Sequence, residues 1–85
     1  MDYAVSIERR ALKALAKIPP PHRGRVATAI DGLASIPYPP GTKKLVGRDA
    51  WRIRVGDYRV IYEIDEMHLV ILVVALGHRQ GVYGI

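Results

Sequence analysis

The chain has 85 residues, 49% of them hydrophobic, and contains no cysteine. This length suits one domain with a thin hydrophobic core, so we expect a single domain over residues 1–85. Without cysteine, neither a disulfide framework nor a thiolate metal site is available. The histidines His22, His68 and His78 lie too far apart in sequence to form a local zinc motif. We therefore expect neither a metal nor another cofactor.

The N-terminal residues lack the basic start and long apolar run that mark a signal peptide. The longest apolar stretch, Leu69 to Leu76, is far shorter than the roughly 20 residues needed to span a bilayer. We expect a cytoplasmic protein with no membrane partner.

Thirteen Lys and Arg residues against eight Asp and Glu residues give a formal net charge of +5. The pI near 9.9 lies in the range typical of nucleic-acid-binding domains. The excess is concentrated between residues 43 and 59, where six cations stand against two anions. The cations are Lys43, Lys44, Arg48, Arg52, Arg54 and Arg59, and the anions are Asp49 and Asp57. This distribution predicts a surface that binds a polyanion, RNA above all.

The N-terminal half predicts a short strand followed by two helices. Tyr3 to Val5 can form the strand, and Ser6 is a candidate N-cap for the first helix. The apolar residues Ala11, Leu12, Leu15 and Ile18 recur at helical spacing, and Arg9, Lys13 and Lys17 form a basic stripe on another face. Pro19 to Pro21 should end this helix.

A second amphipathic helix is predicted around Val26, Ala29, Ile30 and Leu33, ending near Ser35. The short proline-rich link before it makes the two helices an antiparallel hairpin. The following segment, residues 37–41, contains three prolines and a glycine and should be a stiff connector.

The C-terminal half has the pattern of a β-sheet. We expect a short strand at Leu45 and Val46, then strands over Trp51 to Val55, Tyr58 to Ile64 and His68 to Leu76. Gly56-Asp57 suits a two-residue type II′ turn, and Glu66-Met67 suits a second turn. The fold class is therefore α+β: an N-terminal strand, a helical hairpin, and a mostly antiparallel four-stranded sheet, with one extra short strand allowed for (β-α-α-β-β-β).

The Gly56-Asp57 turn sets a register in which Arg54 lies opposite Arg59. Because side chains alternate across a sheet, the hairpin sorts into two faces. The core face carries Trp51, Ile53, Val55, Tyr58, Val60 and Tyr62. The other, here named the arginine face, carries Arg52, Arg54, Arg59, Ile61 and Glu63. Opposed like charges cost stability, so this face reads either as a solvated surface or as a site for phosphates, which arginine forks bind bidentately.

The position of the C-terminal residues relative to the arginine face depends on one strand register. An uninterrupted last strand would place His78 on the arginine face and turn Arg79 away from it. A bulge at Gly77 would reverse this assignment. The sequence leaves both arrangements open.

Several segments together resemble the RelE/ParE toxin superfamily, and its RelE-like branch in particular. They are Lys43-Lys44-Leu45-Val46-Gly47, Trp51-Arg52-Ile53-Arg54-Val55, Gly56-Asp57-Tyr58-Arg59-Val60-Ile61-Tyr62, and Val74-Ala75-Leu76-Gly77-His78-Arg79 with Tyr83, preceded by a first helix that reads ERRALKALAKIP. The resemblance implies the toxin of a type II toxin–antitoxin pair, a ribosome-dependent endoribonuclease that cuts mRNA in the decoding site. It also implies an acidic, helix-rich antitoxin as partner.

The resemblance assigns RNA contact to Arg52, Arg54, Arg59, Arg79 and Tyr83. It favours Arg79 over His78 for phosphate contact. The remaining cations, Lys43, Lys44, Arg48, Arg9, Lys13 and Lys17, are candidates for contact with RNA or the ribosome.

The expected reaction is attack of the RNA 2′-OH on the adjacent phosphate, which needs no metal. Some members of the family carry lysine where Arg52 or Arg54 stands, and arginine cannot serve as an ordinary base. His78 is the candidate acid or base. Two alternatives share these features: a ParE-like inhibitor of DNA gyrase that is not an enzyme, and a basic RNA-binding module without cleavage.

Overall fold

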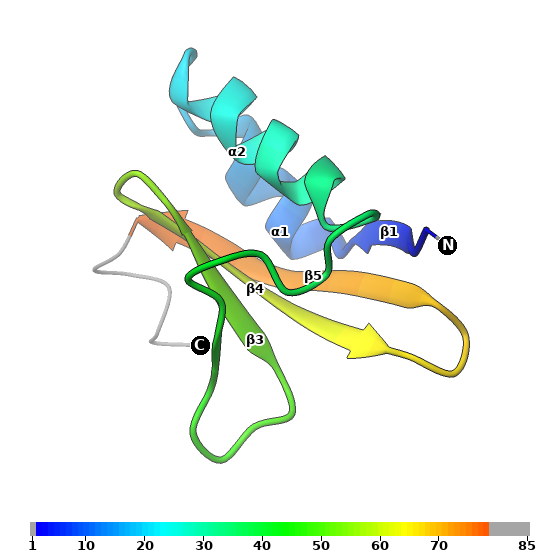
Figure 1. Ribbon diagram of the computed structural model, residues 1–85. Helices are drawn as coiled ribbons and strands as arrows, with labels where there is room; N and C mark the ends of the chain where they lie inside the picture. Colours follow the sequence, from blue (N-terminus) through cyan, green and yellow to red (C-terminus); the bar gives the residue numbers. More distant parts are fainter. Residues whose placement is uncertain (1, 79–85) are drawn as a thin grey trace.

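The structure is a computed structural model and describes residues 2–78. Its elements follow the order β-α-α-β-β-β-β, as Figure 1 shows. They are β1 (Ala4–Ile7), α1 (Arg9–Ala16), α2 (His22–Gly32), β2 (Lys43–Lys44), β3 (Trp51–Val55), β4 (Tyr58–Asp65) and β5 (Val70–His78). The predicted α+β class is confirmed, with the extra short strand present as β2.

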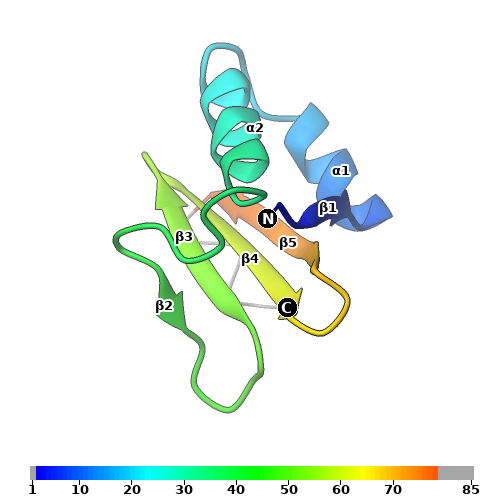
Figure 2. The ribbon, with the colours of Figure 1, turned by 45° about the vertical axis from the view of Figure 1, so that its right-hand side comes forward.

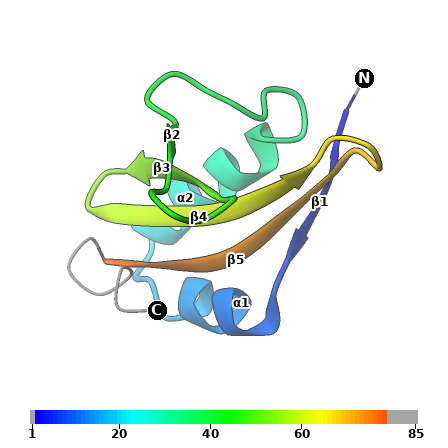
Figure 3. The ribbon, with the colours of Figure 1, turned by 90° about the horizontal axis from the view of Figure 1, so that it is seen from below.

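The strands form one mixed sheet in the order β1-β5-β4-β3-β2 (Figure 2). β1 pairs in parallel with β5, and every other neighbouring pair is antiparallel. The two helices pack on one face of this sheet and leave the other face free of helices (Figures 1 and 3). This one-sided cover gives the sheet a core face and an open face.

The main hydrophobic core lies between the helices and the sheet. Its buried members are Ala11, Ile18, Val26, Ile30 and Leu33 from the helical layer and Ile53, Val60, Tyr62, Ile71, Val73 and Leu76 from the sheet. The helical spacing therefore predicted the buried stripes well, with one error. Leu12 is 53% exposed, because it lies beside the buried stripe of α1.

The first helix starts later than the cap signal predicts. Ser6 lies inside β1, opposite Leu72 of β5. The backbone N–H of Glu8 extends this pairing by donating to the carbonyl of Val73 at 2.9 Å. α1 begins at Arg9 without a side-chain cap. Pairing with a central strand satisfies the backbone around Ser6 and outweighs its local preference as a cap.

Two tyrosines hold the proline-rich connector against the sheet. The Oη of Tyr62 donates to the carbonyl of Pro37 at 2.8 Å, and the Oη of Tyr38 donates to Oε1 of Glu66 at 2.7 Å. The hydrogen bond to Glu66 raises the pKa of Tyr38 to about 12. Burial raises the pKa of Tyr62. Both hydroxyls therefore remain protonated donors at neutral pH.

The short strand lies earlier than predicted. β2 consists of Lys43 and Lys44, whereas Leu45 and Val46 lead into the following turn. Val46 is fully exposed, and Gly47 has a φ of +74°, which turns the chain. The apolar Leu45-Val46 pair gave the wrong position because β2 is an edge strand that pairs only with β3.

The β4–β5 hairpin differs from the prediction in both its turn and its register. Asp65 pairs with Val70, so the turn contains the four residues 66–69 instead of Glu66 and Met67 alone. Asp65 stabilises this turn, because its Oδ1 accepts the backbone N–H of His68 at 3.0 Å and its Oδ2 lies 2.7 Å from His68 Nδ1. β5 consequently runs over Val70–His78 instead of His68 to Leu76.

A bulge interrupts the same hairpin. Ile61 pairs with Ala75 and Tyr62 pairs with Val73, which leaves Val74 as the extra residue. Val74 and Ala75 both join Ala50 and Ile61 in a second, smaller buried cluster, with Leu45 and Leu72 packed against it. Since Ile61 lies on the arginine face, this cluster covers part of the open face with apolar side chains.

Among the described residues, no helix is long and apolar enough to cross a membrane.

Candidate functional site

The β3–β4 hairpin has the register that its turn predicts. Arg54 pairs with Arg59, Ile53 with Val60, and Val55 with Tyr58. Gly56 has a φ of +60° and Asp57 does not adopt a positive φ, as a type II′ turn requires. Ile53 and Val60 are buried under the helices. The arginine face therefore lies on the open side of the sheet.

Lys43 extends the row of cations on this face. It pairs directly with Arg52, and directly paired residues project to the same side of a sheet. Lys43, Arg52, Arg54 and Arg59 thus form a continuous cationic row across β2, β3 and β4. The sequence did not indicate the Lys43–Arg52 pairing, because the strand was expected two residues later.

The cations of this row differ in exposure. Lys43 and Arg54 are exposed, whereas Arg52 and Arg59 are half-buried. Within residues 2–78, Lys43, Arg52 and Arg54 make no ion pair. Partial burial lowers the local dielectric and strengthens the attraction of a guanidinium for an anion. The row can therefore bind phosphate groups without first breaking salt bridges at Lys43, Arg52 or Arg54.

The strand neighbours of the row are a glycine and a buried isoleucine. Gly77 is the β5 partner of Arg59, so no side chain projects next to Arg59 from that strand. Ile61, the partner of Arg52, is only 1% exposed, because Ala50, Val74 and Ala75 pack around it on this face. The cationic row is therefore flanked by small or apolar residues on these two strands.

The open face is acidic at its other end. A groove of about 700 Å³ is lined by Arg48, Asp49, Ala50, Glu63, Ile64, Asp65, His68, Val70 and Leu72. Glu63 shares the arginine face, as predicted, but lies toward this groove opposite Leu72. The carboxylates repel phosphates, so the electrostatic field favours binding of a polyanion at the hairpin tip, near Arg54 and Arg59.

The structure places His78 on the opposite side of the sheet from the arginine row. His78 pairs with Tyr58, whose ring lies against the main core, and the two rings are 5.8 Å apart. Of the two arrangements that the sequence left open, the structure has the one with a bulge, which turns His78 away from the arginine face. The bulge responsible is at Val74 rather than at Gly77. Arg79 and Tyr83 lie outside the described residues.

The other predicted RNA contacts lie in separate places. Lys44 projects to the side of Trp51, with its Nζ 5.8 Å from the ring centroid and 3.7 Å from Oδ1 of Asp49. Arg48 lies in the acidic groove. Arg9, Lys13 and Lys17 line a shallow groove on α1 together with Arg10. Because α1 covers the core face, this stripe is remote from the arginine face.

Residues 2–78 contain no group of three or more His, Cys, Asp or Glu side chains that could hold a metal ion. The cations of the arginine face are the groups available there for binding an anion. Arginine donates five hydrogen bonds in a fixed fork and stays charged, so it can bind and orient a phosphate and stabilise added negative charge. It cannot act as an ordinary proton acceptor.

Comparison with known proteins gives the family. The sequence model described as "ParE toxin of type II toxin-antitoxin system, parDE" matches residues 5–83. RelE1 of Methanocaldococcus jannaschii is 31% identical over 87 residues, which cover 98% of this chain and 97% of that protein.

Comparison with solved structures gives the same family. The chain resembles the archaeal RelE–RelB complex from Pyrococcus horikoshii with a TM-score of 0.84 and 36% identity, over 95% of this chain and 99% of the other. It also resembles the RelBE2 toxin–antitoxin complex from Mycobacterium tuberculosis with a TM-score of 0.82 and 28% identity, over 93% and 100% of the two chains. The chain therefore belongs to the RelE/ParE superfamily of type II toxins, in its RelE-like branch.

Proposed function

We propose that this toxin is a ribosome-dependent endoribonuclease that cuts mRNA in the decoding site and so stops translation. The observation that carries the proposal is the cationic row on the open sheet face. Arg54 and Arg59 are held directly opposite each other next to a tight turn, with Arg52 and Lys43 continuing the row. Such an arrangement costs folding stability and is suited to binding the phosphates of a single RNA strand.

The proposed reaction uses a nucleophile that RNA itself supplies. The 2′-oxygen attacks the adjacent phosphorus, and the bond from phosphorus to the 5′-oxygen breaks. The 2′-hydroxyl gives up its proton, and the leaving 5′-oxygen takes one up. The products are a 2′,3′-cyclic phosphate and a 5′-hydroxyl end. The reaction consumes no water molecule and requires no metal.

Arg54 and Arg59 act on the charge that develops on the non-bridging phosphate oxygens. Backbone pairing holds the two residues directly opposite each other, so both side chains project to the same face. A preorganised donor of this kind contributes about 3 kcal/mol to the stabilisation of a transition state. Arg52 and Lys43 would bind the neighbouring phosphates and set the position of the strand. Arg79 and Tyr83 are proposed to complete the site, on the family resemblance.

Proton transfer is proposed to depend on the ribosome. His78 faces the core side of the sheet, so it is not placed to serve the arginine face. Glu63 lies toward the acidic groove, and we take it as a charge partner there. A guanidinium only donates hydrogen bonds, so the arginines are not suited to the role of general base. Groups of ribosomal RNA and the constrained message would then assist the two proton transfers, which explains why free RNA should be cut poorly.

The basic stripe of α1 is proposed as a contact with ribosomal RNA. Arg9, Lys13 and Lys17 lie on the helical layer, on the opposite side of the molecule from the arginine face. A domain with cations on both sides can hold the message on one side and a ribosomal phosphate backbone on the other. Lys44 and Arg48 each lie close to carboxylates, so they are weaker candidates for this role.

A cognate antitoxin is the proposed protein partner. The P. horikoshii and M. tuberculosis relatives are toxin–antitoxin complexes. An acidic, helix-rich antitoxin would be attracted to this chain, whose formal net charge is +5. A neighbouring reading frame that encodes such a protein would support the pair.

The alternative function is a ParE-like inhibitor of DNA gyrase, which the description of the matching family favours. A gyrase inhibitor has no need for a row of cations suited to RNA phosphates. Assays with purified components distinguish the two functions. We expect the protein to cut a translated message on ribosomes and to leave gyrase-driven supercoiling unchanged. Inhibition of supercoiling without cleavage would establish the alternative.

A further inference from the structure

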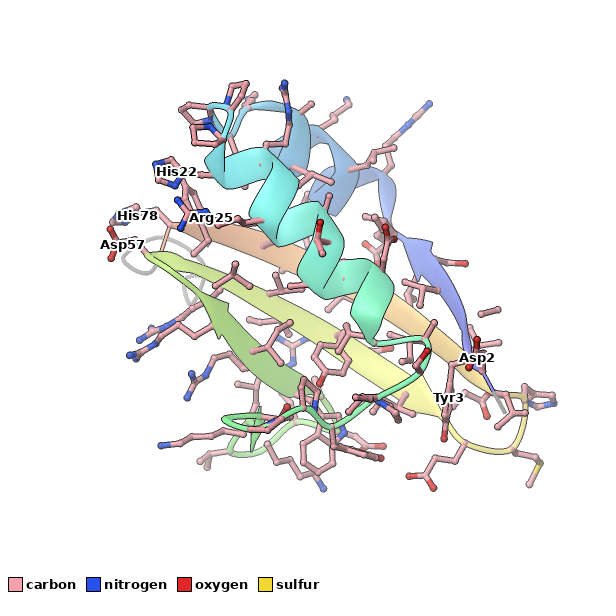
Figure 4. The ribbon with its side chains drawn as sticks, turned by 45° about the horizontal axis from the view of Figure 1, so that its top comes forward. Asp2, Tyr3, His22, Arg25, Asp57 and His78 are labelled. Atoms are coloured by element: carbon pink, nitrogen blue, oxygen red, sulfur yellow. The ribbon has the colours of Figure 1, made fainter. Side chains whose placement is uncertain are left out.

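A second pocket lies beside the same hairpin tip, on the other side of the sheet from the arginine face. It has a volume of about 230 Å³ and is lined by His22 and Arg25 of α2, by Val55, Gly56, Asp57 and Tyr58 of the hairpin, and by His78 of β5. Figure 4 shows the side chains of His22, Arg25, Asp57 and His78 gathered at this end of the molecule. The pocket thus brings together α2, the β3–β4 hairpin and the end of β5.

Three aromatic rings follow one another along the pocket. The ring of Tyr58 lies 6.0 Å from that of His22, tilted by 43°, and 5.8 Å from that of His78, almost perpendicular to it. Tyr58 is half-buried and packed against the core, which fixes its position, whereas both imidazoles are exposed. The two imidazoles therefore offer free ring surface around an anchored tyrosine.

Arg25 adds a fixed positive charge at the same place. Its Nη2 lies 3.0 Å from Nδ1 of His22. A guanidinium can only donate, so Nδ1 of His22 accepts, and the remaining guanidinium N–H groups of Arg25 stay available to an anion. Asp57 is the carboxylate among the pocket residues. The pocket can therefore bind a planar ring next to the rings and an anionic group on Arg25. The carboxylate of Asp57 would repel a second anion.

We propose that this pocket binds one nucleotide of RNA, with its base against His22, Tyr58 and His78 and its phosphate on Arg25. A volume of about 230 Å³ is below the range of pockets for larger organic ligands, which suits a single planar base. Aromatic rings beside a cation are the usual elements of a site for single-stranded nucleic acid.

The location of the pocket connects it with the arginine face. Val55 and Tyr58 form the pair next to Arg54 and Arg59, and only Gly56 and Asp57 lie beyond them. An RNA strand whose phosphates lie on Arg54 and Arg59 can cross this narrow tip and place a following nucleotide in the pocket. Gly56 has no side chain that would obstruct the crossing. In this respect the inference rests on the proposed function and adds a binding subsite to it.

The test is a titration followed by the imidazole carbon–proton signals of a protein with isotope-labelled histidine. Adenosine monophosphate is the probe, and adenosine and inorganic phosphate are titrated separately. We expect the monophosphate to shift the signals of His22 and His78 and to leave His68 unchanged, because His68 lies in the β4–β5 turn at the far end of the sheet. Each separate component should bind more weakly than the monophosphate.

Arg25→Ala should weaken binding of the monophosphate about tenfold, the effect of losing a charge-assisted hydrogen bond. Arg23→Ala is the matched control, because Arg23 is exposed on the same helix, donates to the carbonyl of Ala16 and does not line the pocket. It should bind as the unmodified protein does. Equal losses in the two variants would overturn the role of Arg25.

Three results would overturn the proposal: unchanged His22 and His78 signals, equal shifts at His68, or inorganic phosphate binding as tightly as the monophosphate. The titration is repeated with an Arg54→Ala/Arg59→Ala variant, in which the arginine face is disabled. Binding that persists there establishes the pocket even if the protein fails to cut mRNA. Cleavage on ribosomes without nucleotide binding in the pocket would reject the inference and leave the proposed function intact.

Discussion

Arg54 and Arg59 are direct partners in the β3–β4 ladder, separated along the chain by one pair of residues and a two-residue turn. Their side chains project to the same face, where the two positive charges repel each other. A small domain has little stability to spare. The pair therefore lowers folding stability, and we propose that a bound phosphate relieves the repulsion.

Relief of this repulsion should stabilise the fold. Arg54→Thr removes one charge and introduces a residue that suits a strand, so we expect the free energy of unfolding to rise by about 0.2–1 kcal/mol. The same change should lower mRNA cleavage. Chemical denaturation measures the first effect, and primer extension on ribosomes measures the second.

The control for this prediction is the same substitution in an Arg59→Gln background. With the opposing charge already removed, Arg54→Thr should no longer gain stability from relief of repulsion. An equal gain in both backgrounds would show that strand propensity, rather than charge, is responsible.

The buried stripe of the helical layer predicts unequal effects of two leucines. Leu33 is completely buried between the helices and the sheet, whereas Leu12 is 53% exposed. Leu33→Ala should lower the free energy of unfolding by about 2–5 kcal/mol, because it leaves a cavity in the core. Leu12→Ala should change it by less than about 0.5 kcal/mol. Comparable losses in the two variants would contradict the packing described for α1.

The hydrogen bond from Tyr62 to Pro37 should contribute measurably to stability. Tyr62→Phe keeps the buried ring and removes the donor, leaving the carbonyl of Pro37 without this partner. The expected loss is about 1 kcal/mol in the free energy of unfolding. Tyr38→Phe serves as the comparison, since its hydrogen bond to Glu66 is exposed and should contribute less. Denaturation of both variants tests the difference.

Asp65 should make stability depend on pH in acid. The backbone N–H of His68, and then its side chain, hold the pKa of Asp65 below its ordinary value of 3.8. Because the folded chain has the lower pKa, the stabilisation is present above the unfolded value and is lost as pH falls through the folded value. The free energy of unfolding of the unmodified protein should therefore exceed that of Asp65→Asn, and this difference should shrink as the solution is acidified. A difference in the free energy of unfolding that does not change with pH would show that the ionised carboxylate is not the source of the stabilisation.

The sequence predicted the β3–β4 hairpin in full because its register depends on local chemistry. Gly56 supplies the positive φ of the turn, and the alternation of Arg52, Ile53 and Arg54 leaves one way to bury the apolar side chains. The same logic placed the buried positions of both helices, with the exception of Leu12. Where periodicity and turn chemistry act together, neighbouring residues contain enough information to specify the structure.

The errors arose where pairing between distant segments decides the structure. The bulge at Val74 decides the face of His78, which the sequence left open, and nothing in an apolar run marks which residue is left unpaired. The short strand at Lys43–Lys44 depends on β3 rather than on its own propensity. The pocket around Tyr58 was not predicted either, because it brings α2 and the end of β5 to the hairpin tip.

The most direct test of the proposed function is cleavage of a translated message on purified ribosomes. We expect cuts in the decoding site with the unmodified protein and with Arg23→Ala, and no cuts in naked RNA. Arg54→Ala and Arg59→Ala should each slow cleavage about 100- to 1,000-fold, as loss of a preorganised donor does. Cleavage at an undiminished rate in both arginine variants would contradict the account.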